Sequence, residues 1–281
     1  MVSFYSKTLS KEVSFSQLIT TNTKLEKRGE IVRDIVVKGL SFAPANASGV
    51  ELCGYRSKGC SLACVTWFAG RKVMPMVRDA AIARSLFWFE YSDLFFEMLS
   101  AELSKLVVET KLDDGELYFR PNESSDVDWS ADSRFPWVAK CYDYCASFVR
   151  VMRSLAWHLN YQLTFSIKET TRTTNALAVL ENGGNIACVV DVSYNAQQKK
   201  FGILPSVVSI GGKEFETVDG DVHDVRRREI DGSGKVVLLR LKGTNQAKSD
   251  ARKLGFAKSI SDLGVSSQLE RCESGCDLVL R

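Results

Sequence analysis

The amino-acid sequence predicts an α/β protein with parallel strands, either a (β/α) barrel, complete or incomplete, or an open, doubly wound sheet. Strand-like and helix-like segments alternate along the chain, which is typical of parallel pairing. Hydrophobic residues make up 45% of the 281 residues, which is enough to build one large core. No repeat or linker interrupts the pattern. We therefore expect a single domain that spans residues 1–281.

The first expected strand is Ile35–Ser41, followed by a loop and a segment with three cysteines. Apolar residues then recur at helical spacing from Met76 to Val108, which predicts one long helix or two consecutive ones. The alternation continues with strands at Glu116–Arg120 and Ala139–Tyr142, a helix at Tyr144–Asn160, a strand at Gln162–Ser166, a helix at Asn175–Glu181, and strands at Ile186–Val192 and Val236–Leu241. This strand number favours the barrel, and both arrangements place ligands at the carboxyl ends of the strands.

Composition indicates a cytoplasmic protein. The first sixteen residues mix Lys7, Lys11 and Glu12 with single aromatic residues and lack the apolar stretch of a secretory signal. No apolar run approaches the roughly 18 residues that span a bilayer, so we expect no membrane partner. The eight cysteines then lie in a reducing compartment, where clustered cysteines bind metal or react more often than they form disulfides.

Cys53, Cys60 and Cys64 are the strongest candidates for a cofactor site. Gly54 and Gly59 allow the backbone the tight turns that wrapping around a metal requires. Three thiolates from one segment can hold three irons of a [4Fe-4S] cluster. The fourth iron then stays open to a ligand or is capped by a distant cysteine, with Cys141, Cys145 and Cys188 as candidates.

Zinc is the competing occupant of this segment, and simple packing of small buried residues is the third possibility. A fourth zinc ligand would have to be remote, because the chain contains only two histidines, His158 and His223. Cys272 and Cys276 repeat the three-residue gap near the C-terminus, where we expect a spare pair in a tail and not a second site.

Polar residues at the ends of the expected strands are the candidates for binding a polar substrate. The carboxyl ends of parallel strands meet at one rim, which would bring these side chains together. The residues to which we assign catalytic or orienting roles are Arg120, Asn122, Asp126, Tyr142, Asp143 and Ser166. Lys168, Glu169 and Asp191 also follow strands. The acidic stretch Asp219–Asp224 is expected to be a turn.

Two functions without chemistry compete with an enzyme. A nucleic-acid binder would use Arg226–Arg228 and Lys248–Lys258 as a phosphate surface, with the cysteines holding a structural metal, although the net charge is only +3. A host-interaction protein would instead fit a bacterial target through a surface patch. The partner is therefore either a polar small molecule or a nucleic acid.

Several segments in this order resemble the gene product eighty-eight family of phages and plasmids. They are Leu40–Ala45 with Ser48-Gly49, the cysteine-bearing segment through Arg71, Asn122–Asp126, Tyr142–Tyr144, Leu163–Ser166 and Val218–Asp221. The resemblance implies a phage or mobile-element protein acting in the host cytoplasm, and it groups the cysteines with the strand-end loops.

A more distant similarity is to radical S-adenosylmethionine enzymes, which join a three-cysteine cluster to a parallel barrel. That similarity implies S-adenosylmethionine as a further cofactor. The gaps between the cysteines differ, however, since this chain has six and three intervening residues where that superfamily typically has three and two.

Overall fold

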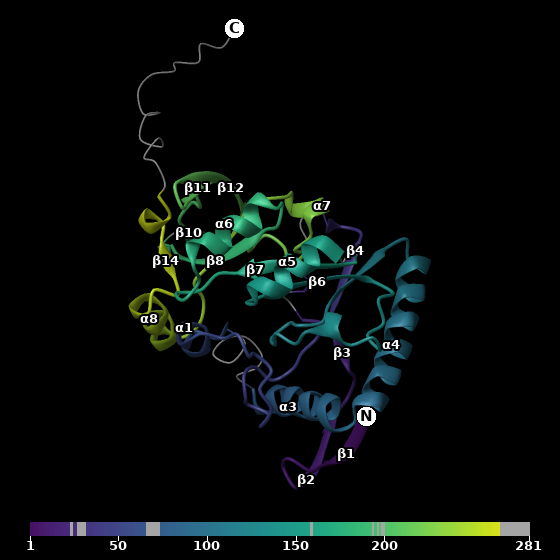
Figure 1. The fold of residues 1–281 in the computed structure, drawn as a ribbon. Coiled ribbons are helices and arrows are strands. Elements are labelled where there is room, and N and C mark those ends of the chain that lie inside the picture. Colours follow the sequence, from purple (N-terminus) through teal and green to yellow (C-terminus); the bar gives the residue numbers. More distant parts are fainter. Residues whose placement is uncertain are drawn as a thin grey trace, which may run out of the picture.

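The fold is known from a computed structural model, which describes residues 1–22, 25–26, 32–65, 74–157, 160–192, 194–195, 197 and 200–264. Its centre is a ten-stranded sheet with the order β11-β12-β13-β8-β7-β6-β5-β4-β3, in which β14 pairs with the end of β8. The strands are β3 (Ile19–Thr20), β4 (Ile35–Leu40), β5 (Glu116–Arg120), β6 (Lys140–Cys145), β7 (Tyr161–Ser166), β8 (Ile186–Asp191), β11 (Val207–Ile210), β12 (Lys213–Asp219), β13 (Val236–Arg240) and β14 (Lys258–Ser259). Neighbours from β4 through β13 to β12 pair in parallel, whereas β3 and β11 run antiparallel at the two sides (Figure 1).

The parallel α/β class is confirmed, but within the described residues the sheet does not close into a barrel. At one side β4 pairs with β3, and at the other β12 pairs with β11, so β4 and β12 do not meet. The strands follow chain order from β4 to β8, after which the order reverses because β13 lies inside β12. An open sheet, consistent with the doubly wound alternative, therefore replaces the expected barrel.

The two faces of the sheet carry different coverings. The longer helices are α3 (Pro75–Glu90), α4 (Ser92–Leu112), α5 (Phe148–Trp157) and α6 (Thr173–Glu181), and all four supply residues to the main hydrophobic core on one face. A smaller core on the other face joins Val37, Tyr118 and Tyr142 to Val225 in the connection after β12. Along β5 and β6 alternate residues enter the two cores, as the strand repeat of two requires.

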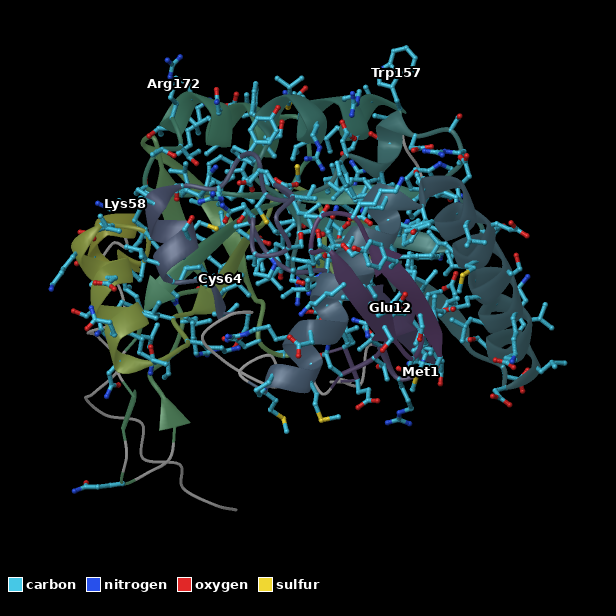
Figure 2. All side chains as sticks on the ribbon, turned by 90° about the horizontal axis from the view of Figure 1, so that it is seen from below. Met1, Glu12, Lys58, Cys64, Trp157 and Arg172 are labelled. Carbon is cyan, nitrogen blue, oxygen red and sulfur yellow. The ribbon has the colours of Figure 1, made fainter. Side chains whose placement is uncertain are left out.

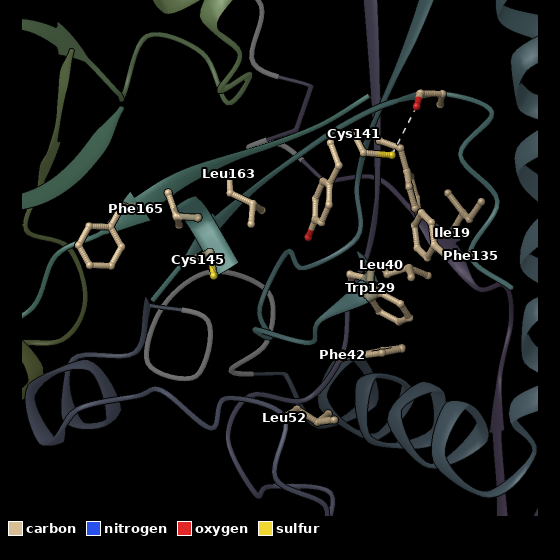
Figure 3. Packing of buried hydrophobic residues seen from close by; sticks show 14 of the residues in the cluster. Ile19, Leu40, Phe42, Leu52, Trp129, Phe135, Cys141, Cys145, Leu163 and Phe165 are labelled. Atoms are coloured by element: carbon tan, nitrogen blue, oxygen red, sulfur yellow. Dashed lines mark hydrogen bonds between the residues drawn. The ribbon is translucent and has the colours of Figure 1, made fainter. Parts of the chain in front are cut away.

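Aromatic rings fill the main core beneath the start of the cysteine-bearing stretch. Phe42, directly after β4, lies 5.9 Å from the ring of Trp129 and 6.0 Å from the ring of Phe95 on α4. Figure 3 shows Phe42 beside Trp129, while Cys145 and Phe165 lie further along the sheet. The stretch that follows β4 therefore leaves the sheet over a rigid, fully buried aromatic group.

Most expected elements are present, and the differences are informative. The helical stretch from residue 76 is two consecutive helices, α3 and α4. Tyr144, expected to begin a helix, instead lies in β6, where it pairs with Thr164 of β7, and its hydroxyl accepts a hydrogen bond from Arg226 at 3.0 Å. The N-terminal hairpin of β1 (Val2–Ser6) and β2 (Lys11–Phe15) was not predicted. It is fastened by Glu90, whose carboxylate accepts from Ser6, Lys7 and Thr8.

The remaining short elements are α1 (Lys58–Leu62), η3 (Trp129–Ala131), β9 (Tyr194–Asn195), β10 (Lys200–Phe201), α7 (Arg228–Asp231), α8 (Asn245–Lys253) and η4 (Ser261–Leu263). None of the helices in the described ranges is long and apolar enough to cross a membrane.

Candidate functional site

The carboxyl ends of β4 to β8 lie along one edge of the sheet. Cys53, Cys60 and Cys64 lie at this edge. We call residues 51–65 the cysteine segment; it follows β4 and contains the short helix α1. Ala63 in this segment packs with Ala251 of α8 and Leu241 at the end of β13. Figure 1 shows α1 next to α8, and in Figure 2 Lys58 and Cys64 lie on the side of the yellow α8. The segment is therefore anchored on elements that lie about 180 residues further along the chain, near its C-terminal end.

Cys53 lies between the loops that follow β4 and β5. Its sulfur accepts a hydrogen bond from the backbone N–H of Ala45 at 3.2 Å and lies 3.8 Å from the carbonyl oxygen of Ser124. Burial raises the pKa of the Cys53 thiol to about 12, and negative charge on Asp126, Cys60 and Cys64 adds to the rise. At physiological pH Cys53 is therefore a neutral thiol.

Cys60 is subject to the same effects. Burial raises the pKa of its thiol to about 11, the charge of Cys64 raises it further, and the ammonium of Lys168 opposes the rise. The three thiols are close enough to act on one another electrostatically. Nevertheless, among the described residues no three His, Cys, Asp or Glu side chains are arranged closely enough to hold a metal ion.

The cysteine segment therefore fits a metal or cluster by the chemistry of its ligands and by its position at the edge of the sheet. Its thiols are not close enough together to hold one in the described structure. Thiolates are the ligands that iron–sulfur clusters and zinc prefer. Bringing them into contact with a metal requires the cysteine segment to draw its thiols together. Cys64 lies next to Val65, where the described range ends.

Of the other described cysteines, Cys145 is nearest to this edge. It ends β6 and is 1% exposed, and its charge interacts with that of Asp126, which also acts on Cys53 and Cys60. Cys141 lies near the opposite end of β6, where its sulfur contacts the carbonyl oxygen of Ala139 at 3.5 Å (Figure 3). Cys188 is in the middle of β8 and is also buried.

The expected rim residues Arg120, Tyr142 and Asp143 do come together, as parts of a buried network. Arg120 donates from Nη1 to both oxygens of Asp224, at 3.0 and 2.9 Å, and its Nε lies 3.9 Å from Asp143. Tyr142 donates its hydroxyl to Asp224 at 3.0 Å. Tyr161 donates its hydroxyl to Asp143 at 2.7 Å.

Asp143 carries a perturbed carboxyl. It is fully buried, and burial raises its pKa to about 7, although Arg120 and the hydroxyl of Tyr161 act in the opposite direction. Arg120 therefore sits between two carboxyls, Asp143 and Asp224, of which Asp224 makes the direct ion pair.

Asn122 and Asp126 organise the loop after β5. The backbone N–H of Asn122 donates to Asp143, and its side chain binds Val127 and Ser125. Asp126 forms an ion pair with Arg150 of α5 at 3.0 Å and accepts from the backbone N–H of Ala146. Ser166 ends β7 and is half-buried. The structure thus joins Arg120 and Asn122 to Asp143 and links Tyr142 to Arg120 through Asp224, whereas Asp126 lies nearer the cysteines.

The Arg226–Arg228 run is not the expected phosphate surface. Arg226 is 1% exposed and donates to Asp231 at 2.7 Å, and Arg227 donates to the carbonyl oxygens of Cys141 and Asn160. Their charges are used inside the protein to hold the connection after β12 against the sheet. Of that expected surface, Arg228 is half-buried, and the Lys248–Lys258 part remains exposed or half-buried over most of its length.

The acidic stretch Asp219–Asp224 is likewise held by protein cations. Both oxygens of Asp219 contact Arg240, and Asp221 contacts Arg240 and Lys242. Sequence reasoning assigned this stretch to a turn and missed Asp224 and Asp231 as partners of buried arginines. An arginine run next to several carboxylates was the available signal. His158, Gly70-Arg71, Cys272 and Cys276 lie outside the described residues.

Fold and site together define a mixed α/β protein with an open, mostly parallel sheet and a thiol-bearing segment at the carboxyl edge. The model of the gene product 88 family matches residues 13–258, so the chain belongs to that family. No curated protein and no solved structure shows significant similarity to it. The segments that suggested the family fall at one edge, in the loops after β4 and β5 and toward the ends of β6, β7 and β12.

Proposed function

We propose that this phage-type or mobile-element protein acts in the host cytoplasm and holds an iron–sulfur cluster on Cys53, Cys60 and Cys64. The observation that carries the proposal is the position of the three thiols on one short segment at the carboxyl edge of the sheet, where negative charge on Cys60 and Cys64 raises the pKa of Cys53, and negative charge on Cys64 raises that of Cys60. A bound cation removes that cost, because it stabilises every thiolate at once. The cytoplasm supplies the reducing conditions in which these thiols stay free.

When bound, a [4Fe-4S] cluster held by three thiolates supplies one iron with an open coordination position. S-adenosylmethionine is the proposed ligand of that position, and a polar small molecule is the proposed substrate. Arg120, Tyr142 and Asp143 form a buried network at this edge of the sheet. Asn122, Asp126 and Ser166 lie around that network. We assign Asp126 and Ser166, which are half-buried, to orienting the substrate, and the buried Arg120, Asn122, Tyr142 and Asp143 to holding the loops of this edge in place.

The test is anaerobic purification followed by a visible spectrum and analysis of iron, sulfide and zinc. We expect broad absorbance near 400 nm and about four irons per chain, lost in a Cys53→Ala, Cys60→Ala, Cys64→Ala variant. Cys141→Ala is the matched control, because it removes a buried thiol at the other end of β6. A folded wild-type protein without metal would contradict the proposal.

Two further outcomes separate the alternatives. Cleavage of S-adenosylmethionine by the reduced, cluster-loaded protein would support radical chemistry, and no cleavage by a fully loaded protein would exclude it. Zinc in place of iron would support the alternative, in which the metal is structural and the protein binds nucleic acid or a host partner. In that case binding to a nucleic acid should weaken steeply with salt.

A further inference from the structure

Glu169, in the loop after β7, grips the cysteine segment from the side. One carboxylate oxygen accepts from the hydroxyl of Ser57 at 2.7 Å, and the other accepts from the backbone N–H of Gly59 at 2.7 Å. Ser57 in turn accepts from the backbone N–H of Cys60 at 3.1 Å, as the N-cap of α1. The hydroxyl of Ser57 therefore links the carboxylate of Glu169 to the backbone N–H of Cys60.

The contact between Glu169 and the segment leaves no room for a side chain at Gly59. A Cβ atom added at Gly59 would lie 2.9 Å from both carboxylate oxygens and 2.6 Å from the Cβ of Phe256, just after α8. Glycine is therefore required for the carboxylate to reach the backbone here. The segment is pressed between the loop after β7 and the residues after α8.

Lys168, the preceding residue, acts on the same segment with its charge. Its ammonium donates to the carbonyl oxygen of Tyr55. The same positive charge favours the ionised forms of Cys60 and Asp126. Lys168 and Glu169 therefore bind backbone groups on both sides of Arg56. The ammonium of Lys168 binds the carbonyl oxygen of Tyr55, and the carboxylate of Glu169 binds the N–H of Gly59.

We propose that Glu169, assisted by Lys168, is a positioning residue that fixes Cys60 and α1 so that the three thiols can be drawn onto one metal or cluster. This inference rests on the proposed function and deepens it. Carboxylates that orient metal-binding groups without touching the metal typically change metal affinity by about 10–100-fold. Glu169 suits that role because both of its carboxylate oxygens bind the cysteine segment at 2.7 Å. No charged side chain among the described residues binds either oxygen at a shorter distance.

The first test is a titration of reduced, metal-free protein with Co²⁺, followed through the thiolate-to-cobalt absorption bands. Affinity should fall about 10–100-fold in Glu169→Ala. Glu169→Gln, which keeps one acceptor oxygen and the shape, should recover part of the loss. Glu181→Ala is the matched control, because Glu181 is an exposed glutamate that pairs with Lys213. Equal affinity in wild type, Glu169→Ala and Glu181→Ala would overturn the inference.

The second test needs no metal. Phenylarsine oxide binds two thiols that lie close together, so it should react with Cys60 and Cys64 faster in the wild type than in Glu169→Ala. The backbone amide of Gly59 should exchange its hydrogen faster in that variant, because it loses its acceptor.

The two tests separate the possible failures. A wild type that binds no metal but shows both metal-free differences would contradict the iron–sulfur proposal and leave the positioning role standing. Unchanged exchange and unchanged arsenical reaction in Glu169→Ala and Glu169→Gln would overturn the positioning role, whatever the metal content.

Discussion

At the scale of single residues, two glycines of the cysteine segment offer a clean comparison. Gly59→Ala would force its new methyl group against Phe256 and Glu169, whereas an added Cβ at Gly54 meets nothing within 4 Å. We expect Gly59→Ala to lower the free energy of unfolding by about 1–3 kcal/mol and to loosen the segment. Gly54→Ala should change it by less than about 1 kcal/mol.

Urea unfolding of both variants, together with the rate at which Cys60 reacts with iodoacetamide, measures these effects. Equal stability and equal thiol reactivity in the two variants would show that the close approach of Glu169 to Gly59 is absent in solution.

Asp143 gives the clearest pH dependence. Its pKa is raised from 3.8 to about 7 in the folded protein, so the folded state holds a proton that the unfolded state releases above pH 4. The stabilisation is complete below about pH 4 and is lost as pH rises to about 7, a change of up to about 4 kcal/mol. The difference in unfolding free energy between wild type and Asp143→Asn should therefore fall across this window. A constant difference from pH 4.5 to 7.5 would contradict it.

At the scale of elements, the connection from β12 to β13 contains a buried ion pair between Arg226 and Asp231. Arg226 and Asp231 have side chains that are 0% and 1% exposed, 2.7 Å apart. Arg226→Met should lower the unfolding free energy by about 3–5 kcal/mol, because it leaves a buried carboxylate without its cation. Arg228→Met, which alters a half-buried neighbour, is the control and should cost less than about 1 kcal/mol.

A double-mutant cycle completes this measurement. Adding Asp231→Leu to Arg226→Met should restore part of the loss, because both charges are then gone. Additive effects of the two substitutions would show that the pair does not hold the connection.

The sequence predicted β4, β5, β6, β7, β8 and β13, because apolar runs bounded by turns identify them locally, but it missed β12, in which charged and apolar residues are mixed. It could not predict that Arg226 and Arg227 are buried, since an arginine run next to acids has the composition of a solvated surface. Their partners, Tyr144 and the carbonyl oxygen of Cys141, are about 80 residues away in the chain. The cysteines were recognised as a cofactor segment and Glu169 as a strand-end group, but the contacts between Glu169 and the segment depend on the tertiary structure.

At the scale of the whole molecule, the aromatic group of the main core tests whether the chain unfolds as one unit. Phe95 is fully buried among Phe42, Phe87, Phe96 and Trp129. Phe95→Ala should lower the unfolding free energy by about 3–5 kcal/mol. Leu112→Ala, at a position that is 79% exposed, should change it by less than about 0.5 kcal/mol.

The same experiment addresses the single-domain prediction. Loss of far-ultraviolet circular dichroism and exposure of the Cys188 thiol should follow one urea transition in the wild type, and both should shift together in Phe95→Ala. Two separate transitions would divide the chain into independently unfolding parts.

The stacking of Trp129 on Phe95, at 6.2 Å and 15° between the rings, has a practical consequence. Trp129 is 1% exposed and touches Phe42, the residue through which the chain leaves β4 on its way to Cys53. The indole ring of Trp129 is therefore shielded from water, yet it lies beside the stretch of chain that would shift if the thiols closed around a metal. In a variant whose other four tryptophans are replaced by phenylalanine, the fluorescence of Trp129 would follow metal entry in real time without an added label.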